Sequence, residues 1–322
     1  MKTLSLTAPM TFGVDEMVQP TEADLGPDQV LLKSIAGGVC GSDLPYFRGL
    51  TMRWSDQANP GFISKPGSPM HEILGEVIAS TDSRHKVGDK VVGWSTAYEG
   101  LRPYLIVPGN HVGPYDPQWE PQVAINLQPL ACIIYAVDRL GDLNGKSVTV
   151  LGMGPIGAMF AQLAKERGAS RVVGVDPIDH AETSKLFKAD EFVQLTASMW
   201  ADQISDADRP DVVVEAVGHN TLTVNDAISG VAPNGLVFAF GVPDEESRAF
   251  DFSTFQHKDL TLKSGLTRHH RDTLATADDY LRANPQLARN LTTDVLGFDE
   301  AQKAYDRANT PQTGRLKVVL TR

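Results

Sequence analysis

The pattern of apolar and polar residues changes character partway along the chain. Up to about residue 120, short apolar runs such as Gln29–Ile35, Ile73–Ala79 and Lys90–Gly93 are separated by turn signals such as the Val-Gly-Asp at 87–89. Short runs interrupted by glycine and proline indicate strands joined by turns. We therefore expect a mostly-β region here, with a long loop around residues 45–69, where periodic apolar residues are few.

Beyond residue 122, strand-like runs alternate with helix-compatible segments, the first of which covers Ile156–Arg167. The runs are Ser147–Leu151, Arg171–Val175, Asp211–Glu215, Gly235–Phe240 and Leu260–Ser264. Such alternation predicts an α/β fold with a doubly wound parallel sheet. The C-terminal part is mixed, with an amphipathic segment at Thr273–Ala283 and a final strand at Leu316–Thr321.

A glycine motif directly follows the first of these strands and opens a helix. It reads Gly152-Met153-Gly154-Pro155-Ile156-Gly157. Gly152 permits a tight turn, Gly154 lets a pyrophosphate approach the backbone, and Gly157 allows close packing of helix and strand. The free N–H groups of the helix N-terminus favour phosphates. The motif therefore predicts a dinucleotide site, with ordinary turn glycines as the alternative.

Asp176 ends the next strand and decides which dinucleotide fits. A carboxylate there can accept hydrogen bonds from both ribose hydroxyls and would repel a 2′-phosphate. NAD is therefore favoured over NADP. The alternative for Asp176 is a plain helix cap.

A candidate metal site lies in the N-terminal region. Cys40 is placed in a glycine-rich turn, and the His71-Glu72 pair precedes the strand Ile73–Ala79. Thiolate, imidazole and carboxylate are ligands of catalytic zinc, which leaves one position open for water or substrate. A buried cysteine beside a histidine without a metal is the alternative.

Several segments in a fixed order resemble the zinc-containing medium-chain dehydrogenase family, in its polyol and sugar dehydrogenase branch. They are Gly-Val-Cys-Gly-Ser-Asp at 38–43, His-Glu at 71–72 before Gly-Glu-Val, Val-Gly-Asp-Lys-Val at 87–91, the glycine motif, Glu-Ala-Val-Gly at 215–218, and Gly-Arg-Leu-Lys-Val-Val-Leu at 314–320. The resemblance implies a GroES-like catalytic domain over 1–122, a Rossmann domain over 123–267, and a C-terminal return over 268–322. It also implies an active site in the cleft between the domains.

The resemblance assigns the metal ligands residue by residue. Cys40 and His71 match two zinc ligands, and Glu72 matches a glutamate that approaches the metal during ligand exchange. Gln128 stands where relatives carry a third, often glutamate, ligand, and binds directly or through water. Cys132 competes with it, since residues four apart share one helix face.

The resemblance also implies the chemistry, in which zinc acts as a Lewis acid and NAD takes a hydride from a secondary alcohol. Ser42 matches the hydroxyl that receives the substrate proton, and Asp43 suits the role of orienting His71. A turn pair bonded to nearby backbone is the alternative for Ser42 and Asp43. Pro45 stands where many members carry a relay histidine, so another group must complete the proton path.

Further residues are assigned to the cofactor and the substrate. Val217 and Gly241 would lie beside the nicotinamide, and Lys317 matches a basic residue near the pyrophosphate, with a solvated lysine as the alternative. The long loop and Trp94 would help to line the substrate pocket; the loop residues concerned are Tyr46, Arg48, Arg53 and Trp54. The Gln128 segment favours a polyol, sugar or cyclitol-like substrate.

Composition narrows the possible partners. The 322 residues carry a net charge of −11, which disfavours nucleic acid and anionic membrane surfaces. With only two cysteines, the four-cysteine structural zinc lobe of many relatives cannot form, so at most one zinc is expected. The N-terminus does not have the pattern of a signal peptide, and no apolar run approaches about 20 residues, so we expect a cytoplasmic protein.

Two other functions remain open at this point. One is a zinc-free reductase of activated double bonds on the same fold, and the other is a non-catalytic NAD-binding scaffold. Relatives are commonly dimers or tetramers that assemble through the edge of the Rossmann sheet, so a homodimer or homotetramer acting on a small-molecule alcohol is expected.

Overall fold

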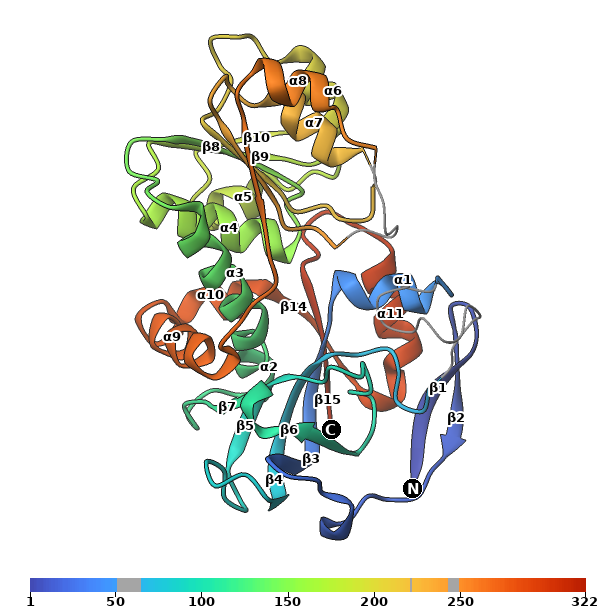
Figure 1. The fold of residues 1–322 in the computed structure, drawn as a ribbon. Coiled ribbons are helices and arrows are strands. Elements are labelled where there is room, and N and C mark those ends of the chain that lie inside the picture. Colours follow the sequence, from blue (N-terminus) through green and yellow to red (C-terminus); the bar gives the residue numbers. More distant parts are fainter. Residues whose placement is uncertain (51–64, 221, 243–248) are drawn as a thin grey trace. The chain divides into compact units, whose positions relative to one another are not determined.

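A computed structural model describes residues 1–50, 65–220, 222–242 and 249–322 (Figure 1). The chain forms two compact units. The first unit consists of Met1–Cys132, Arg268–Pro311 and Leu316–Arg322, and the second consists of Ile133–Thr267 and Gln312–Arg315. The N-terminal segment of the first unit therefore ends at Cys132, ten residues beyond the expected boundary at residue 122.

The first unit is built on a seven-stranded sheet in the order β14-β15-β3-β4-β5-β7, with β6 also paired to β3. Its strands are β3 (Gln29–Val39), β4 (Glu72–Ser80), β5 (Lys90–Trp94), β6 (Tyr104–Pro108), β7 (Val112–Pro114), β14 (Thr292–Gly297) and β15 (Lys317–Thr321). Only β14 and β15 run parallel. A separate hairpin pairs β1 (Lys2–Ala8) with β2 (Thr11–Glu16). The predicted mostly-β region is therefore confirmed.

The C-terminal segment returns to this sheet. Strand β15 pairs antiparallel with β3, and Val318 lies opposite Val39. Lys317 therefore lies at the level of Cys40, just beyond the end of β3. Helix α11 (Ala301–Asn309) packs on β15, and its buried Tyr305 contacts the ring of Phe47 with centroids 5.1 Å apart. The last part of the chain thus completes the core of the first unit.

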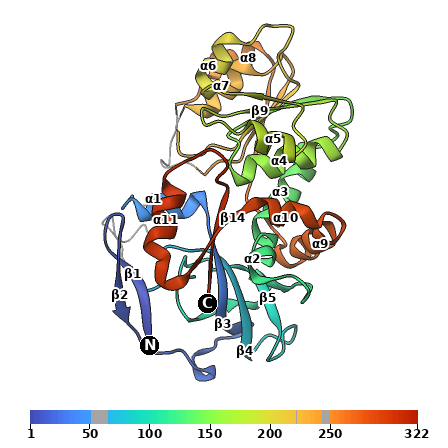
Figure 2. The same cartoon turned by 180° about the vertical axis from the view of Figure 1, so that it is seen from behind.

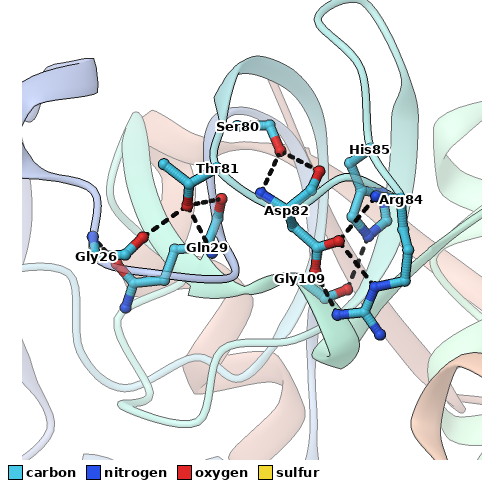
Figure 3. Close-up of polar contacts among 8 residues, drawn as sticks. All are labelled: Gly26, Gln29, Ser80, Thr81, Asp82, Arg84, His85 and Gly109. Atoms are coloured by element: carbon cyan, nitrogen blue, oxygen red, sulfur yellow. Dashed lines mark hydrogen bonds and ion pairs between the residues drawn. The ribbon is translucent and has the colours of Figure 1, made fainter.

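Short helices connect the strands of the first unit. They are α1 (Leu44–Phe47), α2 (Pro121–Ala124), α9 (His270–Ala283), α10 (Pro285–Leu291) and α11 (Ala301–Asn309), with 3-10 turns η1 (Glu22–Asp24), η2 (Gly41–Asp43), η3 (Gly109–His111) and η4 (Phe298–Glu300). Figure 3 shows a polar cluster that fixes the turn after β4. Buried Asp82 pairs with Arg84, and His85 Nε2 lies 2.8 Å from the carbonyl oxygen of Gly109. These contacts join the turn to η3, before β7.

The second unit has a six-stranded parallel sheet in the order β10-β9-β8-β11-β12-β13. The strands are β8 (Ser147–Leu151), β9 (Arg171–Val175), β10 (Glu191–Val193), β11 (Val212–Glu215), β12 (Leu236–Ala239) and β13 (Thr261–Ser264). The helices are α4 (Pro155–Glu166), α5 (Ala181–Leu186), α6 (Ala197–Gln203), α7 (Thr223–Gly230) and α8 (Phe252–His257). Figure 2 shows α4 and α5 on one face of this sheet and α6 to α8 on the other. The predicted doubly wound parallel sheet is confirmed.

The expectation that no segment is long and apolar enough to span a membrane needs a correction. Helix α2 and helix α3 (Leu127–Leu140) form one helical stretch, Pro121–Leu140, whose length and hydropathy alone would suffice to cross a membrane. Within the described residues, 78% of its most apolar window is buried. The stretch therefore has the burial of a core helix, and its apolar residues pack inside the protein.

Candidate functional site

Cys40 lies where β3 ends and η2 begins. Its backbone N–H donates to Asp43 Oδ2 at 2.9 Å, which closes the turn around the thiol. Because Asp43 is fully buried, this bond is protected from water and fixes the backbone that carries the thiol.

Three possible metal ligands converge next to this turn. The ligand atoms of Cys40, His71 and Glu72 all lie within 4.8 Å of one another. The imidazole of His71 is oriented by Asp43, since Nδ1 lies 2.7 Å from Asp43 Oδ1, and Nε2 is left for a metal. Burial lowers the pKa of His71, but the Asp43 carboxylate and Cys40 outweigh it and raise that pKa well above 6.5. The predicted orienting role of Asp43 has the geometry that it requires.

Glu72 forms a buried ion pair beneath this cluster. Its Oε1 lies 2.5 Å from Lys317 Nζ, and both side chains are almost completely buried. Burial lowers the pKa of Lys317, but the negative charges of Glu72 and Cys40 outweigh it and raise that pKa. The alternative of a solvated strand-end lysine is therefore wrong. The predicted contact of Lys317 with the cofactor pyrophosphate stays a prediction.

The second carboxylate oxygen of Glu72 makes the site suitable for a metal. Oε2 is buried, and among the described residues it has no hydrogen-bond partner. A buried carboxylate oxygen without a partner is costly. The ligand atoms of the carboxylate, the thiol and the imidazole lie within 4.8 Å of one another, so one divalent cation would reach all three. Thiolate, imidazole and carboxylate match the ligand chemistry of zinc.

The other residues predicted to belong to the metal site are Ser42, Gln128 and Cys132. Ser42 is half-buried in η2, between Cys40 and Asp43. Gln128 is buried on α3, and its Nε2 donates to Cys132 Sγ at 3.6 Å. The two candidates for a third ligand therefore contact each other. Binding of the metal by Gln128, directly or through water, stays a prediction.

The expected substrate-pocket residues lie in different surroundings. Trp94 is buried, pairs in register with Glu72, and has its ring 4.4 Å from that of His270. Arg48 Nε donates to Asn309 Oδ1 at 2.7 Å, so its guanidinium is held by α11. Arg53 and Trp54 lie outside the described residues.

Tyr98 is a site residue that the sequence did not reveal. Its ring centroid lies 5.1 Å from that of His71 and 4.9 Å from that of Tyr46. Because it belongs to no motif and no periodic pattern, only its position in the folded chain could identify it.

The glycine loop of the second unit has the geometry of a phosphate site. Gly152 has a φ of +89°, which favours glycine. A Cβ at residue 157 would collide with the carbonyl oxygen of Gly152, whereas a Cβ at residue 154 would have no neighbour within 4 Å. Pro155 and Ile156, which begin α4, are only half-buried. Open space therefore adjoins the helix N-terminus, where an anion would bind.

Asp176 connects this loop to the end of β9. Its Oδ2 accepts from the backbone N–H of Met153 at 2.8 Å, and its Oδ1 accepts from Ile178 N–H at 2.8 Å. Each oxygen keeps a further lone pair. The carboxylate thus lies next to the glycine loop, while its predicted bonds to a ribose stay a prediction.

A buried carboxylate shapes the neighbouring turns. Oε1 of Glu215 accepts from the backbone N–H groups of Val217 at 3.0 Å and Gly218 at 2.9 Å, and from Thr223 Oγ1 at 2.9 Å. The backbone N–H of Gly241 donates to the carbonyl oxygen of Glu215 at 3.0 Å. Glu215 therefore positions both predicted nicotinamide contacts. The motif at 215–218 had signalled this segment, although not the role of its first residue.

Together, a zinc-type ligand set and a dinucleotide-type glycine loop define a metal- and nucleotide-dependent oxidoreductase. Comparisons with known proteins agree with this class. Residues 26–112 match a family model described as "Alcohol dehydrogenase GroES-like domain". Residues 155–282 match a model described as "Zinc-binding dehydrogenase". The chain belongs to the family of zinc-binding alcohol and polyol dehydrogenases and is an oxidoreductase.

Individual relatives are similar over nearly their full length. D-arabinitol dehydrogenase 1 of Uromyces fabae is 28% identical, and the match covers 90% of this chain and 90% of that protein. L-threonine 3-dehydrogenase of Caldanaerobacter subterraneus subsp. tengcongensis is 26% identical, over 95% and 94% of the two chains. The structure of alcohol dehydrogenase TADH from Thermus sp. ATN1 superposes with a TM-score of 0.79 over 100% of both chains, at 24% identity.

Proposed function

We propose that this protein oxidises a secondary hydroxyl group of a polyol, sugar or cyclitol-like substrate with NAD as the hydride acceptor. The observation that supports this most strongly is the convergence of Cys40, His71 and Glu72, whose ligand atoms lie within 4.8 Å of one another. Curated relatives named for D-arabinitol, sorbitol and erythritol or L-threitol favour a polyhydroxylated substrate class.

In this proposal each residue has a defined task. When bound, zinc supplies Lewis acidity to the substrate hydroxyl and NAD supplies the hydride-accepting ring. Cys40 and His71 hold the metal, and Asp43 holds both of them in place. Ser42 receives the substrate proton. Since Pro45 cannot pass that proton on, water or a ribose hydroxyl completes the path.

The cofactor is assigned to NAD by the acidic residue beside the glycine loop. Asp176 lies with one oxygen 2.8 Å from the backbone nitrogen of Met153, so its charge adjoins the place where a ribose would sit. A 2′-phosphate there would meet a like charge. We therefore expect NAD to be preferred to NADP.

The test is turnover of a panel of polyols, sugars and aminocyclitols, read by NADH absorbance. It should be run with and without a chelator, on the wild type and on Cys40→Ser. We expect turnover of at least one substrate, lost with the chelator and in the variant. Chelator-insensitive reduction of activated double bonds would instead indicate the zinc-free reductase. NAD binding without turnover of any substrate would indicate a scaffold.

We further propose that a second copy of this chain is the partner. Strand β13 ends the sheet order in the described part of the second unit. It carries Leu262, which is 38% exposed, and is followed by Leu266, which is 78% exposed. A terminal strand of a sheet with exposed apolar side chains favours pairing with another chain. Light scattering should give a dimer or tetramer that Leu262→Lys dissociates; a wild-type monomer would contradict this.

A further inference from the structure

The segment Ser95–Arg102, which we call the Tyr98 loop, follows β5 where many relatives carry a four-cysteine lobe. Its backbone is bonded to the residues that precede Glu72. Ser95 N–H donates to the carbonyl oxygen of His71 at 2.8 Å, Met70 N–H donates to that of Tyr98 at 2.9 Å, and Gly100 N–H donates to that of Met70 at 2.9 Å. These bonds hold both sides of the peptide segment that carries the candidate metal ligand.

The loop is also braced by its own contacts. Tyr98 N–H donates to the carbonyl oxygen of Ser95 at 3.0 Å. Arg102 pairs with Glu99 at 2.7 Å, and its Nε donates to the carbonyl oxygen of Pro66 at 2.7 Å. Because both ends of the loop are tied, the side chain at its tip is held in a fixed place.

Tyr98 occupies that tip in an unusual backbone conformation. Its φ is +59°, a left-handed value that is unfavourable for a bulky residue with a Cβ. Such residues persist where the surrounding structure over-determines them, and they gather at functional sites.

The position of the ring suggests what the strained conformation achieves. Asp43 holds the His71 imidazole at Nδ1, and the Cys40 side chain is a second hydrogen-bond partner of the ring. Hydrogen bonds at the ring nitrogens lie close to the plane of the ring, so they leave its faces without support. The Tyr98 ring lies against the same imidazole, with centroids 5.1 Å apart and planes inclined by 50°. Tyr46, from α1, supports Tyr98 from another side at 4.9 Å.

We propose that Tyr98 is a positioning residue that fixes the tilt of the His71 ring and so directs Nε2 to the metal. The inference rests on the proposed function only in that it requires His71 to bind a metal. It concerns the geometry and strength of metal binding and not the identity of the substrate.

The experiment compares Tyr98→Gly with Tyr98→Phe in the full-length protein. Glycine removes the ring and relieves the left-handed backbone, so the variant should fold; phenylalanine keeps the ring. Groups that orient metal ligands are typically worth about 10–100-fold in metal affinity. We expect Tyr98→Gly to bind zinc about tenfold more weakly in chelator competition, and Tyr98→Phe to match the wild type.

A second readout records the geometry directly. Cobalt in place of zinc gives an absorption spectrum that reports the ligand field. We expect this spectrum to change in Tyr98→Gly and to be restored in Tyr98→Phe. If wild type binds zinc but Tyr98→Gly has the same affinity and cobalt spectrum, the inference is overturned and the proposed function stands. If the wild type binds no zinc, the proposed function fails first.

Discussion

The two candidate sites are built in opposite ways. The glycine loop and Asp176 belong to one continuous strand-helix-strand segment, so the residues of this site lie close together along the chain. The metal cluster instead brings together the end of β3, the start of β4 and the C-terminal strand β15. Local sequence therefore encodes the nucleotide site, whereas the metal site depends on sheet register.

The largest expected effect is a loss of folding stability when the ion pair next to the metal site is broken. Lys317→Met leaves Glu72 buried without its cation, and losing one partner of a buried ion pair costs about 3–5 kcal/mol. We expect urea unfolding of the metal-free protein to show a loss of that size. The glycine loop itself does not depend on this pair, so a fall in NAD affinity in the same variant would instead indicate the predicted contact of Lys317 with the cofactor pyrophosphate.

The double variant Glu72→Gln/Lys317→Met tests the cause of that loss. With both charges removed, no buried charge is left uncompensated, so most of the stability should return. If the double variant is as unstable as Lys317→Met, packing of the lysine chain and not the ion pair carries the effect, and the register of β15 matters for another reason.

The next largest effect is expected at the glycine loop, the site that local sequence encodes. Gly157→Val forces a side chain onto the carbonyl oxygen of Gly152, and overpacking of this kind costs about 1–3 kcal/mol. NAD binding, measured by fluorescence titration, should be lost while zinc binding is retained. Gly154→Ala is the matched control for stability, because its Cβ has no neighbour within 4 Å. Equal destabilisation by the two variants would contradict the packing argument.

The difference between the two sites also explains which parts of the structure could be predicted from the sequence. The predicted strands Ser147–Leu151 and Arg171–Val175 have the observed bounds of β8 and β9, because buried parallel strands are continuous apolar runs. Strand β10 (Glu191–Val193) went unnoticed, since Glu191 is exposed, the other two residues are only half-buried, and the three form no such run. Apolar patterning therefore missed this edge strand, although it found the edge strand β13 within the predicted run Leu260–Ser264.

The same limit applied to the metal site. Cys40, His71 and Glu72 were proposed as ligands because a family motif marks each of them. The pairing of Glu72 with Lys317 and the contact of Tyr98 with His71 depend on which strands and loops lie side by side. No pattern along the chain records that juxtaposition, so these contacts required the folded structure.

A smaller effect is expected on the zinc affinity of the metal site. Asp43→Asn keeps the shape of the side chain but removes the charge that holds His71, so we expect zinc affinity to fall by about 10–100-fold. Chelator competition measures this, with Asp279→Asn, an exposed carboxylate of the same unit, as the control. An unchanged zinc affinity would mean that the backbone of η2 alone positions the ligands.

The smallest effect concerns pH and again separates the two units. In the first unit the rings of His111 and His270 lie 4.8 Å apart. Burial lowers the pKa of both rings, and for His270 the charges of His111 and His269 lower it further. At these two rings the unfolded state therefore binds more protons, and their contribution to stability falls as pH drops below about 6.5 towards the folded-state values.

Because both rings are only half-buried, their contribution should be small, about 2 °C in Tm between pH 7.5 and pH 5.5, and it is measured as the difference between the wild type and a variant. We expect His270→Asn to reduce it, since one of the two protonation sites is gone and the like-charge contact with it. His257→Asn, an exposed residue of the second unit, should leave the pH dependence as it is. If His257→Asn reduces the acid sensitivity as much as His270→Asn does, the contact of α9 with η3 is not its source, and the first unit is no more sensitive to acid than the second.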